Sequence, residues 1–292
     1  MINGYKMPFT CGTDAHGNHI YFPNTTLSQI NSLKKFDESL RLFLLKYITQ
    51  VEEEVRTLTG YKFDQYNENG KIPWYAYSTN VTLQSKMNTI SSAYSELSKS
   101  KSEYVQFYMK NHEQIPTWIM IKVVNFSTFI DVLQNSKTNV THAICKLYSM
   151  YDDNNLPNVK LLIGSLHWLR RVRNSCAHNE RVFCIHQTQA RNNSASGRIL
   201  DPYYAQLPTS YSRCTEKNIF DILVYFKYFL PKEEFAPMIM ELKNMLIELQ
   251  GTLQPNAFDN VRGQMGIKNL SVLDTLISLP KSKIEYHKFD TL

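Results

Sequence analysis

Apolar residues between positions 25 and 59 recur at every third or fourth place, and this periodicity constrains the fold more than any other feature. The recurring residues are Leu33, Phe36, Leu40, Phe43, Leu44, Tyr47, Ile48 and Val51. This spacing puts side chains on one face of an α-helix. Thr25 or Thr26 can cap the helix, and Gly60 would end it. The sequence therefore predicts a long amphipathic helix that reaches about Thr59.

Similar helical patterns, separated by glycine, proline and polar residues, continue along the chain without a succession of strands. We expect further helices over residues 83–99, 103–111, 116–134, 141–150, 158–180, 216–229 and 233–249. Glycines and prolines in residues 1–24 predict an N-terminal arm. Residues 185–213, rich in Asn, Ser and Pro, predict a long loop. The fold class is therefore predicted to be all-α: a helical bundle over residues 25–253, with a C-terminal tail at 254–292.

Composition and the first residues of the chain predict the cellular compartment of the protein. No apolar run approaches the roughly 20 residues that cross a bilayer, so no membrane association is expected. Residues 1–10 lack a basic patch followed by an apolar stretch, so we expect no secretion signal. The five cysteines are an odd number without a C-x-x-C pair. Together these features predict reduced thiols and a cytoplasmic location.

The positive charge is concentrated in one part of the chain. Residues 158–213 contain eight Lys/Arg and two Asp/Glu, which accounts for the whole net charge of +6. A basic patch attracts polyanions, and phosphates dominate nucleic-acid affinity. The alternative is a solvated helix face followed by a polar loop.

The predicted helix at 158–180 has two faces. Its apolar face consists of Leu162, Leu166, Leu169, Val172 and Cys176. A polar stripe, spanning about 80° around the axis, consists of His167, Arg171, Asn174, His178 and Arg181. Ordinary exposed faces carry Lys and Glu, and this one carries neither. A solvent-facing stripe without a binding role is the alternative.

Arg173 continues the apolar register of the same helix, which is a poor place for a charge unless an anion answers it. It lies about 140° around an ideal helix from His178. Either the helix distorts between Ser175 and Ala177, or a second copy of the chain completes a site. A structural ion pair with Glu52 is the alternative for Arg173.

These residues resemble a known family. Residues 173–178 look like the R-N-x-x-x-H form of the R-x(4–6)-H signature of HEPN ribonucleases. Residues 169–181 are similar to the L-R-N-x-C-A-H-x-x-R block of bacterial abortive-infection proteins (Abi family, AbiD/AbiF-like). Residues 40–63 resemble a second block, with Glu52 and Arg56 on its matching positions, and residues 115–129 resemble a third. The chain departs from the pattern at Lys122, Ser127 and Cys184.

The resemblance implies a HEPN-like helical bundle that cuts RNA without a metal or cofactor. The ribose 2′-OH would attack the adjacent phosphorus and leave a 2′,3′-cyclic phosphate and a 5′-OH. Arg173, Asn174 and His178 would be catalytic. RNA-binding residues would be Arg170, Arg171, Arg181, Lys160, Arg191 and Arg198, and supporting residues would be Glu52, Arg56 and His167. The resemblance further implies a homodimer with a composite site and control by a small RNA or a protein partner.

Three other sequence signals have more than one interpretation. Cys176, His178, Cys184 and His186 offer four zinc ligands, but their i, i+2 spacing points each pair apart on a helix. Cys11, Asp14, His16 and His19 could bind a metal weakly, but they lie in the expected flexible arm, and a polar arm without a metal is the alternative. Tyr203, Tyr204 and Tyr211 in the basic loop could stack on bases or simply pack.

Three functions remain open at this point. The first is a defence or toxin endoribonuclease. The second is a non-catalytic RNA-binding protein that uses the same basic surface. The third is a HEPN protein that works with a separate nucleotidyltransferase.

Overall fold

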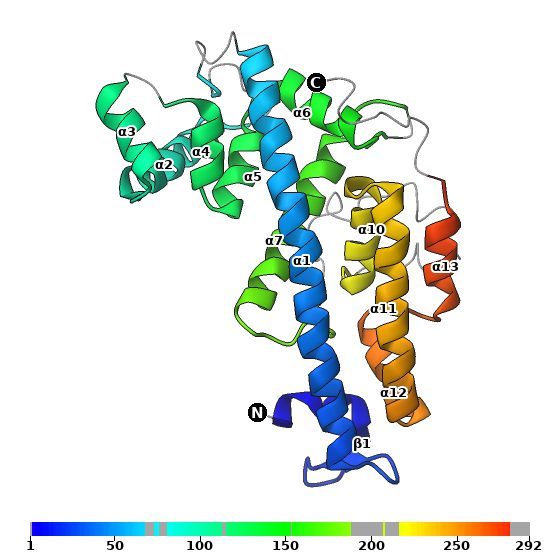
Figure 1. The fold of residues 1–292 in the computed structure, drawn as a ribbon. Helices are drawn as coiled ribbons and strands as arrows, with labels where there is room; N and C mark the ends of the chain where they lie inside the picture. Colours follow the sequence, from blue (N-terminus) through cyan, green and yellow to red (C-terminus); the bar gives the residue numbers. More distant parts are fainter. Residues whose placement is uncertain are drawn as a thin grey trace. The chain divides into compact units, whose positions relative to one another are not determined.

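The structure is a computed structural model that describes residues 2–67, 73–75, 81–112, 115–152, 154–187, 207 and 216–280. These residues are predominantly α-helical, which confirms the predicted all-α class (Figure 1). They form two compact units, one of residues 2–47 and 171–280 and one of residues 48–170. We call them the terminal unit and the central unit. Helices α1 and α7 each contribute to both. Across the described residues, no helix is both long and apolar enough to span a membrane.

Helix α1 runs from Leu27 to Tyr66, and its start is fixed by a reciprocal cap. Thr26 Oγ1 accepts the Gln29 N–H at 3.3 Å, and Gln29 Oε1 accepts the Thr26 N–H at 3.2 Å. These bonds confirm the predicted cap at Thr26. The predicted apolar face is also confirmed, because all eight periodic residues are buried. The predicted end at Gly60 is wrong. A Cβ at Gly60 would make an ordinary van der Waals contact of 3.4 Å with the Trp118 Cβ, and α1 continues past this glycine to Tyr66.

The prediction of a flexible arm at the beginning of the terminal unit is wrong. Two short 3-10 helices, η1 (Ile2–Tyr5) and η2 (Met7–Phe9), precede strand β1 (Thr10–Thr13), which pairs antiparallel with β2 (His19–Tyr21). The turn is held by Asp14, whose Oδ1 accepts the His16 and Asn18 N–H groups at 2.8 Å. Tyr5 and Phe9 are buried, so apolar anchoring fixes this segment.

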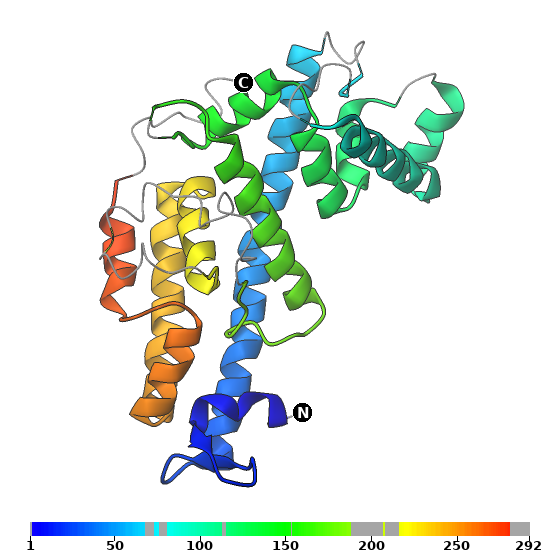
Figure 2. The same ribbon diagram turned by 180° about the vertical axis from the view of Figure 1, so that it is seen from behind.

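The rest of the terminal unit contains α10 (Ile219–Phe229), α11 (Lys232–Thr252), α12 (Pro255–Gln264) and α13 (Ser271–Ser278). Every residue of α10 is buried, which explains its nearly continuous apolar sequence. Figure 2 shows α11 between α10 and α13 from behind, in agreement with its contacts to both. Residues expected as a C-terminal tail thus include two helices. Their short apolar faces pack on α11 and η2, and such contacts are invisible to local periodicity.

The central unit contains α2 (Leu83–Lys99), α3 (Glu103–Asn111), α4 (Thr117–Val123), α5 (Phe126–Gln134) and α6 (Thr138–Leu147). The single helix predicted for 116–134 is wrong, because Asn125 divides it. Asn125 Oδ1 caps α5 by accepting the Thr128 N–H at 3.1 Å. The Glu96 carboxylate of α2 accepts the Asn125 N–H and side-chain amide, both at 2.6 Å. A contact 29 residues away therefore stabilises the break.

Candidate active site

Helix α7 spans Val159–Ala177, so it ends three residues before the predicted end at Glu180. Asn179 has a positive φ of 56° and ends the helix. The Glu180 N–H bonds to the Ser175 carbonyl at 2.9 Å, and the Asn179 N–H to the Cys176 carbonyl at 3.2 Å. This pattern is a Schellman motif, in which asparagine tolerates the left-handed conformation. Arg181 therefore lies beyond the helix, and its predicted place on the polar stripe is wrong.

Arg173 and Asn174 lie in the last turn of α7, and His178 directly follows Ala177, the last residue of the helix. The Arg173 Nη1 donates to Asn174 Oδ1 at 3.2 Å, and both side chains are half-buried. His178 is exposed, and its N–H makes a regular helical bond to the Asn174 carbonyl at 2.9 Å. The structure thus brings the guanidinium to the asparagine, with the imidazole one turn further along. The helix is regular from Arg173 to Ala177. The helix distortion considered for residues 175–177 is therefore absent from this stretch.

Asp37 of α1 holds the chain that follows His178. Its Oδ1 accepts the N–H groups of Val182 at 3.0 Å and Phe183 at 2.9 Å. Its Oδ2 accepts the Tyr5 hydroxyl at 2.9 Å and Arg41 Nη1 at 2.6 Å. Burial raises the pKa of the Asp37 carboxyl, and these four donors oppose that rise only in part. One buried carboxylate thereby fixes the segment after the candidate catalytic histidine.

The N-terminal segment takes part in the same arrangement. Arg181 donates to the Gly4 carbonyl, and Tyr5 stacks on Phe183 with ring centroids 6.1 Å apart. Arg41 also donates to the Glu180 carbonyl at 3.3 Å. Sequence reasoning missed the roles of Asp37, Tyr5 and Arg41. The only local signal was Asp37 and Arg41 at i, i+4 on the predicted long helix, where a buried acidic residue interrupts an apolar face.

A surface cavity of about 780 Å³ adjoins this segment. It is lined by Gly4, Tyr5, Lys34, Glu38, Arg41, Asn179, Glu180, Arg181 and Cys184. Three lining residues are basic and two are acidic, and Lys34 and Glu38 pair with each other at 3.1 Å. The cavity wall begins at Asn179, directly after His178, so a ligand held there lies next to the end of α7.

The residues predicted to contact RNA differ in solvent exposure and in their hydrogen-bond partners. Lys160 is exposed, and so is Arg171, whose Nη2 donates to the His186 carbonyl at 3.4 Å. Arg181 is exposed as well, but it bonds to Gly4 as described. Arg170 is half-buried in the central unit and donates to Ser127 Oγ at 3.1 Å. Arg191 and Arg198 lie outside the described residues, as do Tyr203, Tyr204 and Tyr211.

The predicted supporting residues belong to the central unit. Arg56 binds Glu52 Oε1 through Nη2 at 2.7 Å and through Nε at 3.1 Å. It also donates to the carbonyls of Ile121 and Val124, and it lies 4.8 Å from the Phe129 ring centroid. These contacts join α1 to the α4–α5 junction, so Arg56 stabilises the packing of the central unit. His167 is half-exposed on α7.

Cys176, one of the four possible zinc ligands, lies between Asn174 and His178 in the sequence and is buried. It is 5% exposed, and burial raises the pKa of its thiol to about 12. The same thiol is thus protonated at neutral pH unless a metal displaces its proton. In the part of the chain that the structure describes, no three His, Cys, Asp or Glu residues group as potential metal ligands.

These observations define an all-α protein with an arginine, an asparagine and an exposed histidine at the end of one helix. A family model described as Abi-like protein matches residues 1–184. Because this match covers more than half of the chain, the protein belongs to the Abi-like protein family. The match contains the N-terminal hairpin, Asp37 and the whole candidate site. The family assignment indicates a role in abortive infection, a form of defence. No curated protein and no solved structure matches the chain.

Proposed function

We propose that this Abi-like protein is a HEPN-type endoribonuclease that cuts RNA without a metal ion. The observation that supports this most is the grouping of Arg173, Asn174 and His178 at the C-terminal end of α7. Arg173 and Asn174 are hydrogen bonded, and the imidazole of His178 is open to solvent. An exposed imidazole can carry protons near neutral pH, and a guanidinium supplies the fixed positive charge that a phosphorane needs.

In the proposed reaction the ribose 2′-oxygen attacks the adjacent phosphorus, and the bond from phosphorus to the 5′-oxygen breaks. The His178 imidazole accepts the 2′-OH proton, and the leaving 5′-oxygen takes up a proton from the imidazolium so formed or from water. Arg173 neutralises the non-bridging phosphate oxygens. Asn174, which accepts from Arg173, orients that guanidinium. The products are a 2′,3′-cyclic phosphate and a 5′-OH.

A second copy of the chain is part of the proposal. Arg173 and His178 lie about 140° apart around the axis of a regular helix. One helix therefore presents them to different sides, whereas two facing helices can place the arginine of one and the histidine of the other on the same phosphate. We propose a homodimer with composite sites, controlled by a small RNA or a protein partner.

Cleavage of end-labelled RNA by the purified protein tests the reaction. We expect cutting that persists in EDTA and leaves cyclic phosphate ends. His178→Ala should slow cutting by about 10²- to 10⁴-fold. His186→Ala is the matched control, because His186 is also exposed and lies eight residues further along. Cutting that EDTA abolishes, or that survives in His178→Ala, would refute the proposal.

A non-catalytic RNA-binding protein is the second candidate. Exposed Lys160 and Arg171 on α7 favour it, since they provide phosphate contacts without chemistry. Binding of RNA with no cleavage under any condition, and with equal affinity in His178→Ala, would support this candidate.

A further inference from the structure

A second basic cavity lies in the central unit, where the C-terminal end of α1 faces α6. Its volume is about 320 Å³, within the range of small-molecule sites. It is lined by Lys62, Tyr66, Asn139, His142, Ala143, Lys146 and Leu147. None of these described lining residues is acidic, and two are lysines. The described lining therefore carries a net positive charge.

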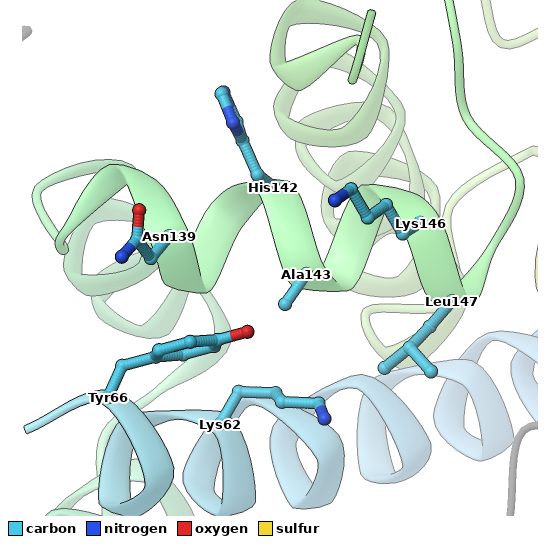
Figure 3. Close-up of a pocket in the computed structure, with 7 residues that line it drawn as sticks. All are labelled: Lys62, Tyr66, Asn139, His142, Ala143, Lys146 and Leu147. Atoms are coloured by element: carbon cyan, nitrogen blue, oxygen red, sulfur yellow. The ribbon is translucent and has the colours of Figure 1, made fainter. Parts of the chain in front are cut away.

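Figure 3 shows how the polar groups are arranged. Lys62 and Tyr66 extend from α1, and the Tyr66 hydroxyl reaches into the space beside Ala143. Asn139 and Lys146 come from α6, and His142 points away from α1 and so lies at the rim. The backbone at Tyr66 is held by Lys137, whose Nζ donates to the Tyr66 carbonyl at 3.3 Å. Donors from two helices thus line one space.

Lys62 is an unusual lining residue because it is only 6% exposed. Its Nζ donates to the neutral Gln65 Oε1 at 3.0 Å and lies 5.2 Å from the Tyr61 ring centroid. Burial lowers the pKa of this amine. Removing an ammonium from water is costly, and an anion beside it would recover part of that cost.

We infer that this cavity binds a small phosphate monoester, with Lys62 and Lys146 as its cationic contacts. Lysine is a regular phosphate ligand, and the Asn139 amide and Tyr66 hydroxyl add neutral donors for the remaining oxygens. A small ligand fits better than an RNA backbone, because the backbone binds surface cations whereas Lys62 is almost fully enclosed. The inference is independent of the proposed ribonuclease activity.

Calorimetric titration of the full-length protein with inorganic phosphate and with adenosine monophosphate tests this inference. Citrate and a short single-stranded RNA, at matched ionic strength, serve as comparison probes. We expect both phosphate probes to bind, and Lys62→Met and Lys146→Ala each to weaken binding about tenfold or more. Lys122→Ala is the matched control, since Lys122 is an exposed lysine of the same unit outside the cavity.

Lys146 is exposed, so Lys146→Ala remains a valid test if Lys62→Met fails to fold. No binding of either phosphate probe would overturn the inference. It would also fail if both lysine variants bound as tightly as the unaltered protein. Binding of only citrate, or of only RNA, would assign the cavity to a different ligand class and equally refute it. His178→Ala should bind the phosphate probes normally, which separates this result from any outcome of the cleavage assay.

Discussion

The Asp37 carboxylate and the Phe183 backbone N–H are joined by a buried hydrogen bond of 2.9 Å across 146 positions of sequence. With the parallel bond to Val182, it ties the start of α1 to the segment that follows the candidate catalytic histidine. Tyr5 and Arg41 complete the same cluster on the other carboxylate oxygen. The end of α7 is thus positioned by contacts that neither α7 nor its sequence pattern contains.

Replacement of Asp37 should destabilise the terminal unit strongly. Asp37→Ala leaves Arg41 and two backbone N–H groups without their acceptor, and removal of one partner from a buried pair costs about 3–5 kcal/mol. Urea unfolding measures this loss. Glu38→Ala is the control, because its pair with Lys34 is largely exposed and contributes about 1 kcal/mol or less. Equal stability of the two variants would show that Asp37 does not anchor the segment.

Asn179 should tolerate glycine but not a β-branched residue. Its φ of 56° is strained for most side chains, and glycine adopts it freely. We expect Asn179→Gly to keep or slightly increase stability, and Asn179→Val to lose about 1–2 kcal/mol. Thermal and urea unfolding compare the two. A valine variant as stable as the glycine variant would contradict the left-handed helix end.

Mixing two inactive variants should restore cleavage if the site is composite. Arg173→Ala and His178→Ala each lack one partner in every site of their own dimers. In a mixed dimer, one site pairs the intact arginine with the intact histidine and the other lacks both. Random exchange of protomers should therefore recover about a quarter of the unaltered activity, given that twofold dimers carry two equivalent sites.

Refolding the two variants together and assaying RNA cleavage measures this recovery. A mixture of His178→Ala with Asn174→Ala is a second pair that should behave in the same way if the Arg173–Asn174 couple acts as one half-site. No recovery in either mixture, from dimers shown to exchange, would place the arginine and histidine of each site on one chain.

Cys176 should resist alkylation in the folded protein. Burial raises the pKa of its thiol to about 12, and the Asp37 charge adds to the rise. At pH 8 the thiolate is then about one part in ten thousand, whereas Cys11 is exposed. Mass spectrometry after iodoacetamide treatment should find Cys11 modified and Cys176 unmodified. Alkylation of both at similar rates would contradict the burial of Cys176.

The same shift predicts sensitivity to alkali. A thiol pKa that is higher in the folded state than in the unfolded state favours folding while the thiol is protonated. This contribution is complete below the unfolded value near 9 and is lost as the pH rises toward about 12. Unfolding free energies measured across this range should fall less steeply for Cys176→Ala than for the unaltered protein.

Local patterns located the helices but misplaced several of their ends. The face of α1 was predictable because burial repeats with the helical period, as in Leu40 and Leu44, both fully buried. Gly60 does not end α1, although glycine often follows a helix end, and the break at Asn125 depends on a distant partner, Glu96. Short helices α12 and α13 escaped notice because their burial depends on neighbours rather than on a long periodic stripe.

The amino-acid sequence alone indicates that this protein is helical, that its basic charge is concentrated in one segment, and that Arg173, Asn174 and His178 lie near the end of one helix. Periodicity and spacing fix these features because they act over a few residues. The folded structure was needed to show that Asp37, Tyr5 and Arg41 hold the chain beyond His178, and that Lys62 is enclosed beside a cavity. Those contacts join residues far apart in sequence, and burial and charge pairing become defined only when the helices pack.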